Sequence, residues 1–166
     1  FVRTLTVRLH DDLGGRPVVD GHDGRRRRLA PVPLQPRWLP EGWRLVDEFG
    51  QAGAGGGTWE RGYGPGPAAA GATRGGVRVS RVTVTDGPPS VGRTGLGGPG
   101  GRVIARPSVR GGTAAVERSP ADGWMVVRWR EGRRGLAVRA TFPTDPSDPA
   151  VLAVRDLLVR IARSLR

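Results

Sequence analysis

The chain has 166 residues, 37% of them hydrophobic, which is enough for one domain with a core of its own. The absence of cysteine excludes disulfides, thiolate zinc sites and cysteine nucleophiles. A net charge of +12 favours polyanionic partners such as nucleic acid, anionic lipid or an acidic wall polymer. Every basic residue is arginine, and Gly, Ala, Pro and Val are abundant, which indicates the coding bias of a high-GC bacterium.

The first 37 residues predict a strand followed by irregular chain. Apolar and polar residues alternate over 1–9, which is the pattern of a half-buried strand. Residues 16–36 then combine the turn residues 20–24, four consecutive arginines and several prolines, so we expect a polar loop that runs into extended chain.

Residues 38–117 predict further short strands between glycine-rich loops. A strand begins at Trp43 after a turn, a short one covers 58–61, and most of 50–76 is loop. The valines of 77–85 change parity, which predicts a strand with a bulge near residues 80–81. Two more strands, 103–109 and 113–117, are joined at Gly111-Gly112.

Residues 124–130 and 135–142 each alternate in polarity and predict a hairpin with Glu131 to Arg134 as its loop. Arg128, Arg130 and Arg139 then point to one side. The other side is apolar and carries three facing pairs, which are Met125 with Ala140, Val127 with Val138, and Trp129 with Leu136.

A closing helix is predicted after Asp148, a good N-cap, with Pro149 at the first helical position. Apolar residues recur along it every three or four positions, so it is expected to cover the apolar side of the hairpin. These residues are Val151, Val154, Leu158, Ile161 and Leu165, widened by Leu157 and Ala162.

Because the strands do not alternate with helices, we predict an α+β fold, with a mostly antiparallel sheet of six or seven strands packed against one C-terminal helix. A single domain over 1–166 is expected. In it, residues 1–37 supply the N-terminal strand and the proline- and arginine-rich loop, and residues 38–166 supply the sheet and the helix.

Three motifs carry a resemblance to a known family: Leu39-Pro40-Glu41-Gly42-Trp43, the run from Gly111 through Trp129 to Val138, and Leu157 to Leu165. In this order they resemble an uncharacterised family of extracytoplasmic domains in membrane-anchored bacterial proteins, some attached to anti-sigma-like or sporulation proteins. That family is similar to lipoprotein-carrier and periplasmic sigma-regulator modules, whose curved sheet carries a helix. The first and last motifs also resemble the photosystem-P-protein and Mog-type lipoprotein fold. The resemblance covers 38–166 and carries over no functional residues.

No catalytic residue, cofactor or metal is predicted. The stretches His10-Asp11-Asp12 and Asp20-Gly21-His22-Asp23 contain metal-competent groups, but such groups are commonplace in glycine-rich turns. No serine lies in a Gly-x-Ser-x-Gly elbow. The Gly95-x-Gly97-x-x-Gly100 pattern leads into a strand, so no helix N-terminus follows it to hold a pyrophosphate.

Two sets of residues are candidates for binding. Arg25, Arg26, Arg27 and Arg28 form the densest charge in the chain and are the candidate polyanion contact, with a solvated face as the alternative. Trp38, Trp43 and Trp59 are the candidate ligand groove under the glycine-rich loops, with packing on the core as the alternative.

These features together predict a non-enzymatic extracytoplasmic sensor or interaction domain of a membrane-anchored protein in the cell envelope, with its anchor outside the sequence that begins at Phe1. The expected partner is an anionic membrane surface, an envelope polymer or another protein. A lipid- or lipoprotein-binding carrier module is the alternative. A nucleic-acid-binding domain is the third choice, and no specific nucleic acid is expected.

Overall fold

The structure is a computed structural model that describes residues 18–19, 22, 24, 26–27, 34–51, 57–66, 73–74, 77–92, 101–119, 123–142 and 148–166. The chain forms two compact units, Phe1–Pro31 and Val32–Arg166, and each is described by itself. The expectation of a single domain stays a prediction.

In the first unit, β1 (Val18–Val19) pairs antiparallel with β2 (Arg26–Arg27). Val18 faces Arg27 and Val19 faces Arg26, so a short ribbon interrupts the loop that the sequence predicts there. The strand predicted over 1–9 lies outside the described residues.

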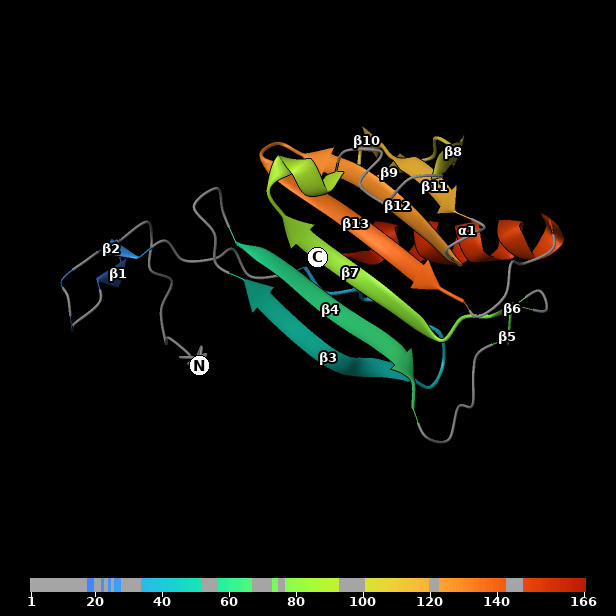
Figure 1. Ribbon diagram of the computed structural model, residues 1–166, viewed down its shortest axis with the longest axis horizontal. Helices are drawn as coiled ribbons and strands as arrows, with labels where there is room; N and C mark the ends of the chain where they lie inside the picture. The colour runs from blue at the N-terminus through green and yellow to red at the C-terminus, as the bar shows by residue number, and fades with distance from the viewer. Residues whose placement is uncertain are drawn as a thin grey trace. The chain divides into compact units, whose positions relative to one another are not determined.

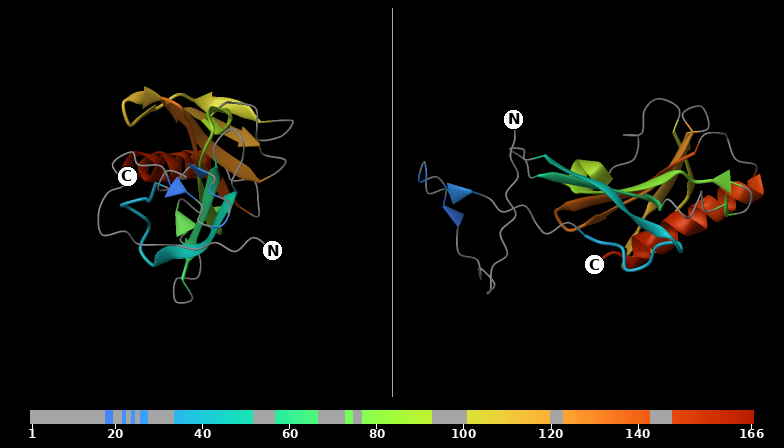
Figure 2. Two further views of the ribbon diagram at one scale, coloured as in Figure 1. Left: turned by 90° about the vertical axis from the view of Figure 1, so that its left-hand side faces the viewer. Right: turned by 90° about the horizontal axis from the view of Figure 1, so that it is seen from below.

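The second unit contains one antiparallel sheet of seven strands, in the order β3-β4-β7-β13-β12-β11-β8. Among the described residues of this unit there is one α-helix, α1 (Asp148–Ser164), and it lies along one face of the sheet (Figures 1 and 2). The α+β fold predicted from the sequence is therefore confirmed. The strands are β3 (Trp43–Gln51), β4 (Thr58–Pro65), β7 (Arg81–Gly87), β8 (Arg102–Ala105), β11 (Ala115–Ser119), β12 (Trp124–Glu131) and β13 (Arg134–Thr141).

Shorter elements surround the sheet. The two-residue strands β5 (Thr73–Arg74) and β6 (Val77–Arg78) pair with each other, as do β9 (Ser108–Val109) and β10 (Gly112–Thr113). A 3-10 turn, η1 (Pro89–Gly92), packs on β12 and β13. The β9–β10 turn has positive φ at both Arg110 and Gly111, as a tight two-residue hairpin turn requires.

The register of the β12–β13 hairpin agrees with the prediction. Met125 faces Ala140, Val127 faces Val138 and Trp129 faces Leu136. All six side chains belong to the main core, and none is more than 2% exposed.

The helix covers this apolar side of the hairpin. It includes Asp148 and Pro149 in its first turn, and its predicted stripe is buried. Val154, Leu158 and Ile161 are at most 1% exposed, whereas Arg160 and Arg163 are exposed. The three- and four-residue spacing of the stripe therefore correctly indicates which face of α1 packs on the sheet.

The sequence predicts a bulge near residues 80–81, but the structure has two separate strands there, with a gap between them. β6 ends at Arg78 and pairs with β5, and β7 begins at Arg81 in the main sheet. Val79 and Val82 are nevertheless both buried, at 1% and 0% exposure. The change of parity is absorbed because Val79 and Ser80 lie outside any strand. The strands predicted over 103–109 and 113–117 are likewise each divided, by residues 106–107 and by Ala114.

The chain end is paired with the segment that precedes β3. Gln35 N donates to Arg166 O at 2.9 Å, and Arg166 N donates to Gln35 O at 3.0 Å. Leu34, Trp38 and Leu39 from the same segment pack on the core. This pairing brings residues near position 37 beside the last turn of α1.

Replacing Trp129 by alanine is expected to destabilise the second unit by about 3–5 kcal/mol, because the ring is 2% exposed between the sheet and α1. Equilibrium denaturation measures the loss. The exposed Leu152→Ala is the matched control, with an expected loss under about 0.5 kcal/mol. A Trp129→Ala loss below about 1 kcal/mol would contradict this account of the core.

Candidate functional site

The three candidate groove tryptophans occupy different environments. Trp43 is 8% exposed within the main core, and Trp38 is partly buried against that core. Trp59 lies at the opposite end of the β3–β4 pair, where it faces Gly50, while Trp43 faces Pro65. A Cβ at Gly50 would lie 2.5 Å from the Trp59 ring, so the ring covers this glycine. The structure does not bring Trp59 together with Trp43, and Trp43 fits the core-packing alternative.

The four candidate arginines 25–28 are described only in part. The backbone of Arg26 and Arg27 forms β2, and Arg25 and Arg28 lie outside the described residues. Polyanion binding by these four residues stays a prediction.

Of the stretches that contain metal-competent groups, only His22 is described, and it is exposed in a turn. His10, Asp11, Asp12, Asp20 and Asp23 lie outside the described residues. Within the part of the chain that the structure describes, no group of three or more His, Cys, Asp or Glu side chains is placed to hold a metal ion.

Many arginines of the second unit are neutralised by carboxylates. Ion pairs join Arg61 to Glu48 at 2.9 Å, Arg81 to Asp47 at 2.7 Å, Arg110 to Glu131 at 2.5 Å, Arg128 to Glu117 at 3.6 Å, Arg155 to Asp156 at 2.8 Å, and Arg134 to Asp86. The positive charge that remains is carried by other arginines.

Four of those arginines gather where α1 ends, and we call Arg37, Arg160, Arg163 and Arg166 the helix-end patch. All four are exposed, and none forms an ion pair with a described carboxylate. Arg160 and Arg163 are three residues apart and are therefore neighbours on the helix surface. The backbone of Arg37 lies beside the end of the helix, because its backbone N–H donates to Ser164 O at 3.1 Å.

Two contacts orient the patch. The Arg160 guanidinium lies 3.8 Å from the centre of the Trp38 ring, a cation–π arrangement. Arg163 Nε donates to Ser108 O at 3.0 Å. The apolar spacing of α1 leaves Arg160 and Arg163 outside the buried stripe, and this can be read from the sequence. The position of Arg37 beside them cannot, because residues 37 and 164 are far apart in the sequence.

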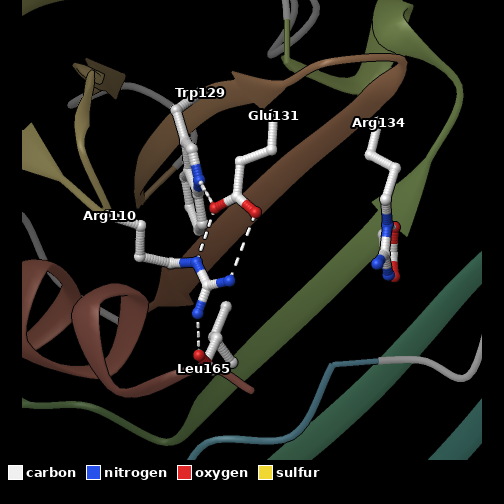
Figure 3. Close-up of polar contacts among 6 residues, drawn as sticks. Arg110, Trp129, Glu131, Arg134 and Leu165 are labelled. Carbon is white, nitrogen blue, oxygen red and sulfur yellow. Dashed lines mark hydrogen bonds and ion pairs between the residues drawn. The ribbon is translucent and has the colours of Figure 1, made fainter.

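A set of polar contacts holds the helix end against the hairpin, and we call it the clamp (Figure 3). Its members are Arg110, Trp129, Glu131 and the carbonyl of Leu165. Arg110 donates to both oxygens of Glu131, from Nε at 2.5 Å and from Nη2 at 3.2 Å, and its Nη1 donates to the Leu165 carbonyl. Trp129 Nε1 donates to Glu131 Oε1 at 2.9 Å. The Arg110 guanidinium thus links the β9–β10 turn to the hairpin and to the chain that follows α1.

The clamp changes the acidity of its carboxyl group. Burial alone would raise the pKa of Glu131, but the hydrogen bonds from Arg110 and Trp129 and the charges of Arg110 and Arg134 outweigh it and lower that pKa below 4.5. A lowered pKa means that folding favours the ionised form.

The other face of the sheet carries a hollow of about 480 Å³. Its floor and walls come from β4, β7, β13, β12 and η1. Arg128, in its wall, is held by Glu117 and donates from Nη1 to Val91 O at 3.1 Å. Burial lowers the pKa of the Arg128 guanidinium, and Arg139 adds to the effect while Glu117 opposes it. The residues that line the hollow are Thr58, Glu60, Arg81, Thr83, Thr85, Val91, Val126, Arg128, Ala137, Arg139 and Thr141.

No family model, curated protein or solved structure matches the chain. No helix among the described residues is both long and apolar enough to cross a membrane. The resemblance drawn from the three motifs therefore remains a prediction.

Replacing Glu131 by glutamine is expected to lower the free energy of unfolding at pH 7 by roughly 1–3 kcal/mol, because Arg110 loses its charged partner. Since the folded-state pKa is lowered, this contribution is present above about pH 4.5 and is lost as the pH falls through the lower folded-state value. Denaturation at a series of pH values should therefore show wild type and variant converging on acidification. Glu41→Gln, at an exposed position, is the control and should track wild type. A constant gap down to pH 3 would contradict the assignment.

Proposed function

We propose that the chain is a non-enzymatic extracytoplasmic interaction domain of a membrane-anchored bacterial protein, and that it contacts an anionic membrane surface or envelope polymer through the helix-end patch. The observation that carries the proposal is the patch itself: four exposed arginines, drawn together from residue 37 and from residues 160–166, with no carboxylate partner among the described residues.

The electrostatics of such a patch suit a surface more than a small ligand. Each arginine near an anionic bilayer gains on the order of 1 kcal/mol, and the attraction falls off within a Debye length of about 8 Å at physiological salt. Four exposed arginines at one end of the second unit add their contributions. The Arg160–Trp38 contact places an aromatic ring beside the charge, which is an arrangement common at membrane interfaces.

The carrier alternative receives less support. A carrier would hold an acyl chain between the sheet and the helix, but large side chains fill that space. Trp129, Leu158 and Ile161 are each at most 2% exposed there. An acyl chain could enter only if these side chains moved, at the cost of a close-packed core.

Vesicles that contain anionic lipid test the proposal. The purified chain should bind them, bind neutral vesicles weakly or not at all, and release as salt increases. Changing Arg160, Arg163 and Arg166 together to serine should weaken binding at least about tenfold, since about 1 kcal/mol is lost per arginine.

The charge-matched control changes Arg44, Arg102 and Arg133 to serine, because these arginines are also exposed and form no ion pair with a described carboxylate. A separate variant that changes Arg25 to Arg28 to serine tests the sequence-derived hypothesis for the first unit. Equal losses in the two triple variants would contradict a specific patch. Tight, sequence-preferring binding of duplex DNA at the same ionic strength would replace the proposal with the nucleic-acid alternative.

A further inference from the structure

The hollow on the open face of the sheet contains two separated charges that no ion pair with a described residue neutralises. The lining has three arginines and one glutamate. Arg81 is paired with Asp47 at 2.7 Å, and Arg128 is paired with Glu117 at 3.6 Å. Arg139 and Glu60 form no ion pair with another described residue.

Arg139 provides the positive charge. It lies on β13, where it faces Val126 on one neighbouring strand and Thr83 on the other. Its guanidinium is 5.2 Å from the centre of the buried Trp124 ring. This stacking holds the planar group in place and leaves its N–H donors available to bind a carboxylate with two hydrogen bonds.

Glu60 provides the negative charge on β4. Its Oε1 accepts a hydrogen bond from Thr85 Oγ1 at 3.5 Å, which is at the limit for such a bond. Its side chain is exposed and faces the same hollow. The carboxylate therefore retains acceptor positions for an ammonium or amide N–H group.

The sheet register fixes the spacing between the backbone positions of the two charged residues. Glu60 faces Thr85, Thr85 faces Ala137, and Arg139 is two residues further along β13. Two strand spacings and two residue rises separate the Cα atoms of Glu60 and Arg139 by roughly 12 Å. Three extended residues span roughly 10 Å, so the length of a tripeptide is close to this Cα separation.

The floor between the charges is small and rich in hydroxyl groups. Thr83, Thr85 and Thr141 offer hydroxyls, and Ala137 keeps the floor low. The volume, about 480 Å³, falls in the range of small-ligand sites.

We propose that this hollow binds a short zwitterionic peptide, with the peptide carboxylate on Arg139, its ammonium group on Glu60 and its backbone over the threonine hydroxyls. The site lies on the sheet face opposite α1 and uses none of the helix-end patch. The absence of peptide binding would therefore leave the proposed surface contact unaffected. The absence of surface binding would likewise leave the peptide proposal unaffected.

The test is an NMR titration of the full chain with Ala-Ala-Ala, with its N-acetylated form and with its C-terminal amide. The free tripeptide should shift the backbone signals of β7 and β13 around the hollow. Each blocked form should bind at least about tenfold more weakly, because each lacks one charge.

Two variants separate the two ends of the ligand. Glu60→Gln should remove the preference for the free amino group and keep the preference for the free carboxylate. Arg139→Gln should remove the preference for the free carboxylate and keep the preference for the free amino group. Arg139→Lys should restore part of the carboxylate preference. Glu41→Gln and Arg133→Gln, which are exposed and outside the hollow, should bind as wild type does.

Three outcomes of the peptide titrations would overturn the proposal, and a fourth comes from the helix-end patch variant. The first is the absence of signal changes at millimolar tripeptide. The second is binding that ignores acetylation and amidation, and the third is equal weakening by the hollow variants and their controls. Loss of binding in the Arg160, Arg163 and Arg166 triple-serine variant would also contradict it, because that variant leaves the hollow intact.

Discussion

The apolar stripe of α1 packs on one side of the β12–β13 hairpin, and the other parts of the second unit take their positions from this contact. It buries Trp129, Leu158 and Ile161 almost completely. Burial of large side chains contributes about 1.5–3 kcal/mol each, so a few such residues outweigh any single polar contact of the unit. The hairpin and the helix both come from the last third of the chain, so the contact between them is local in sequence. The remaining strands extend the sheet on either side of this hairpin.

Polar groups then fix details that apolar packing leaves open. Arg110 ties the β9–β10 turn to Glu131 of the hairpin and to the carbonyl of Leu165 after the helix. At the same end, residues 35–38 pair with residues 164–166. The helix-end patch depends on these contacts, which place the chain end beside residues 35–38. The hollow lies on the face of the sheet that α1 does not cover (Figure 2).

The hairpin register and the helix stripe could be predicted because they depend on periodicity within short segments. The break at Val79 and Ser80 could not, since a bulge and a break both keep Val79 and Val82 on the core side. The helix-end patch and the hollow depend on contacts between distant segments. Nothing local to Arg37 indicates that it lies beside Ser164, and nothing local to Glu60 indicates that it shares a hollow with Arg139.

Native-state hydrogen exchange, read amide by amide, tests most directly whether the helix and the hairpin form one core. If they do, the slowest amides of α1, β12 and β13 should exchange with the same free energy of opening, equal to that of global unfolding. Amides of α1 that open at a free energy well below those of β12 and β13 would contradict the account, because the helix would then be an addition to the sheet rather than the element against which it is built.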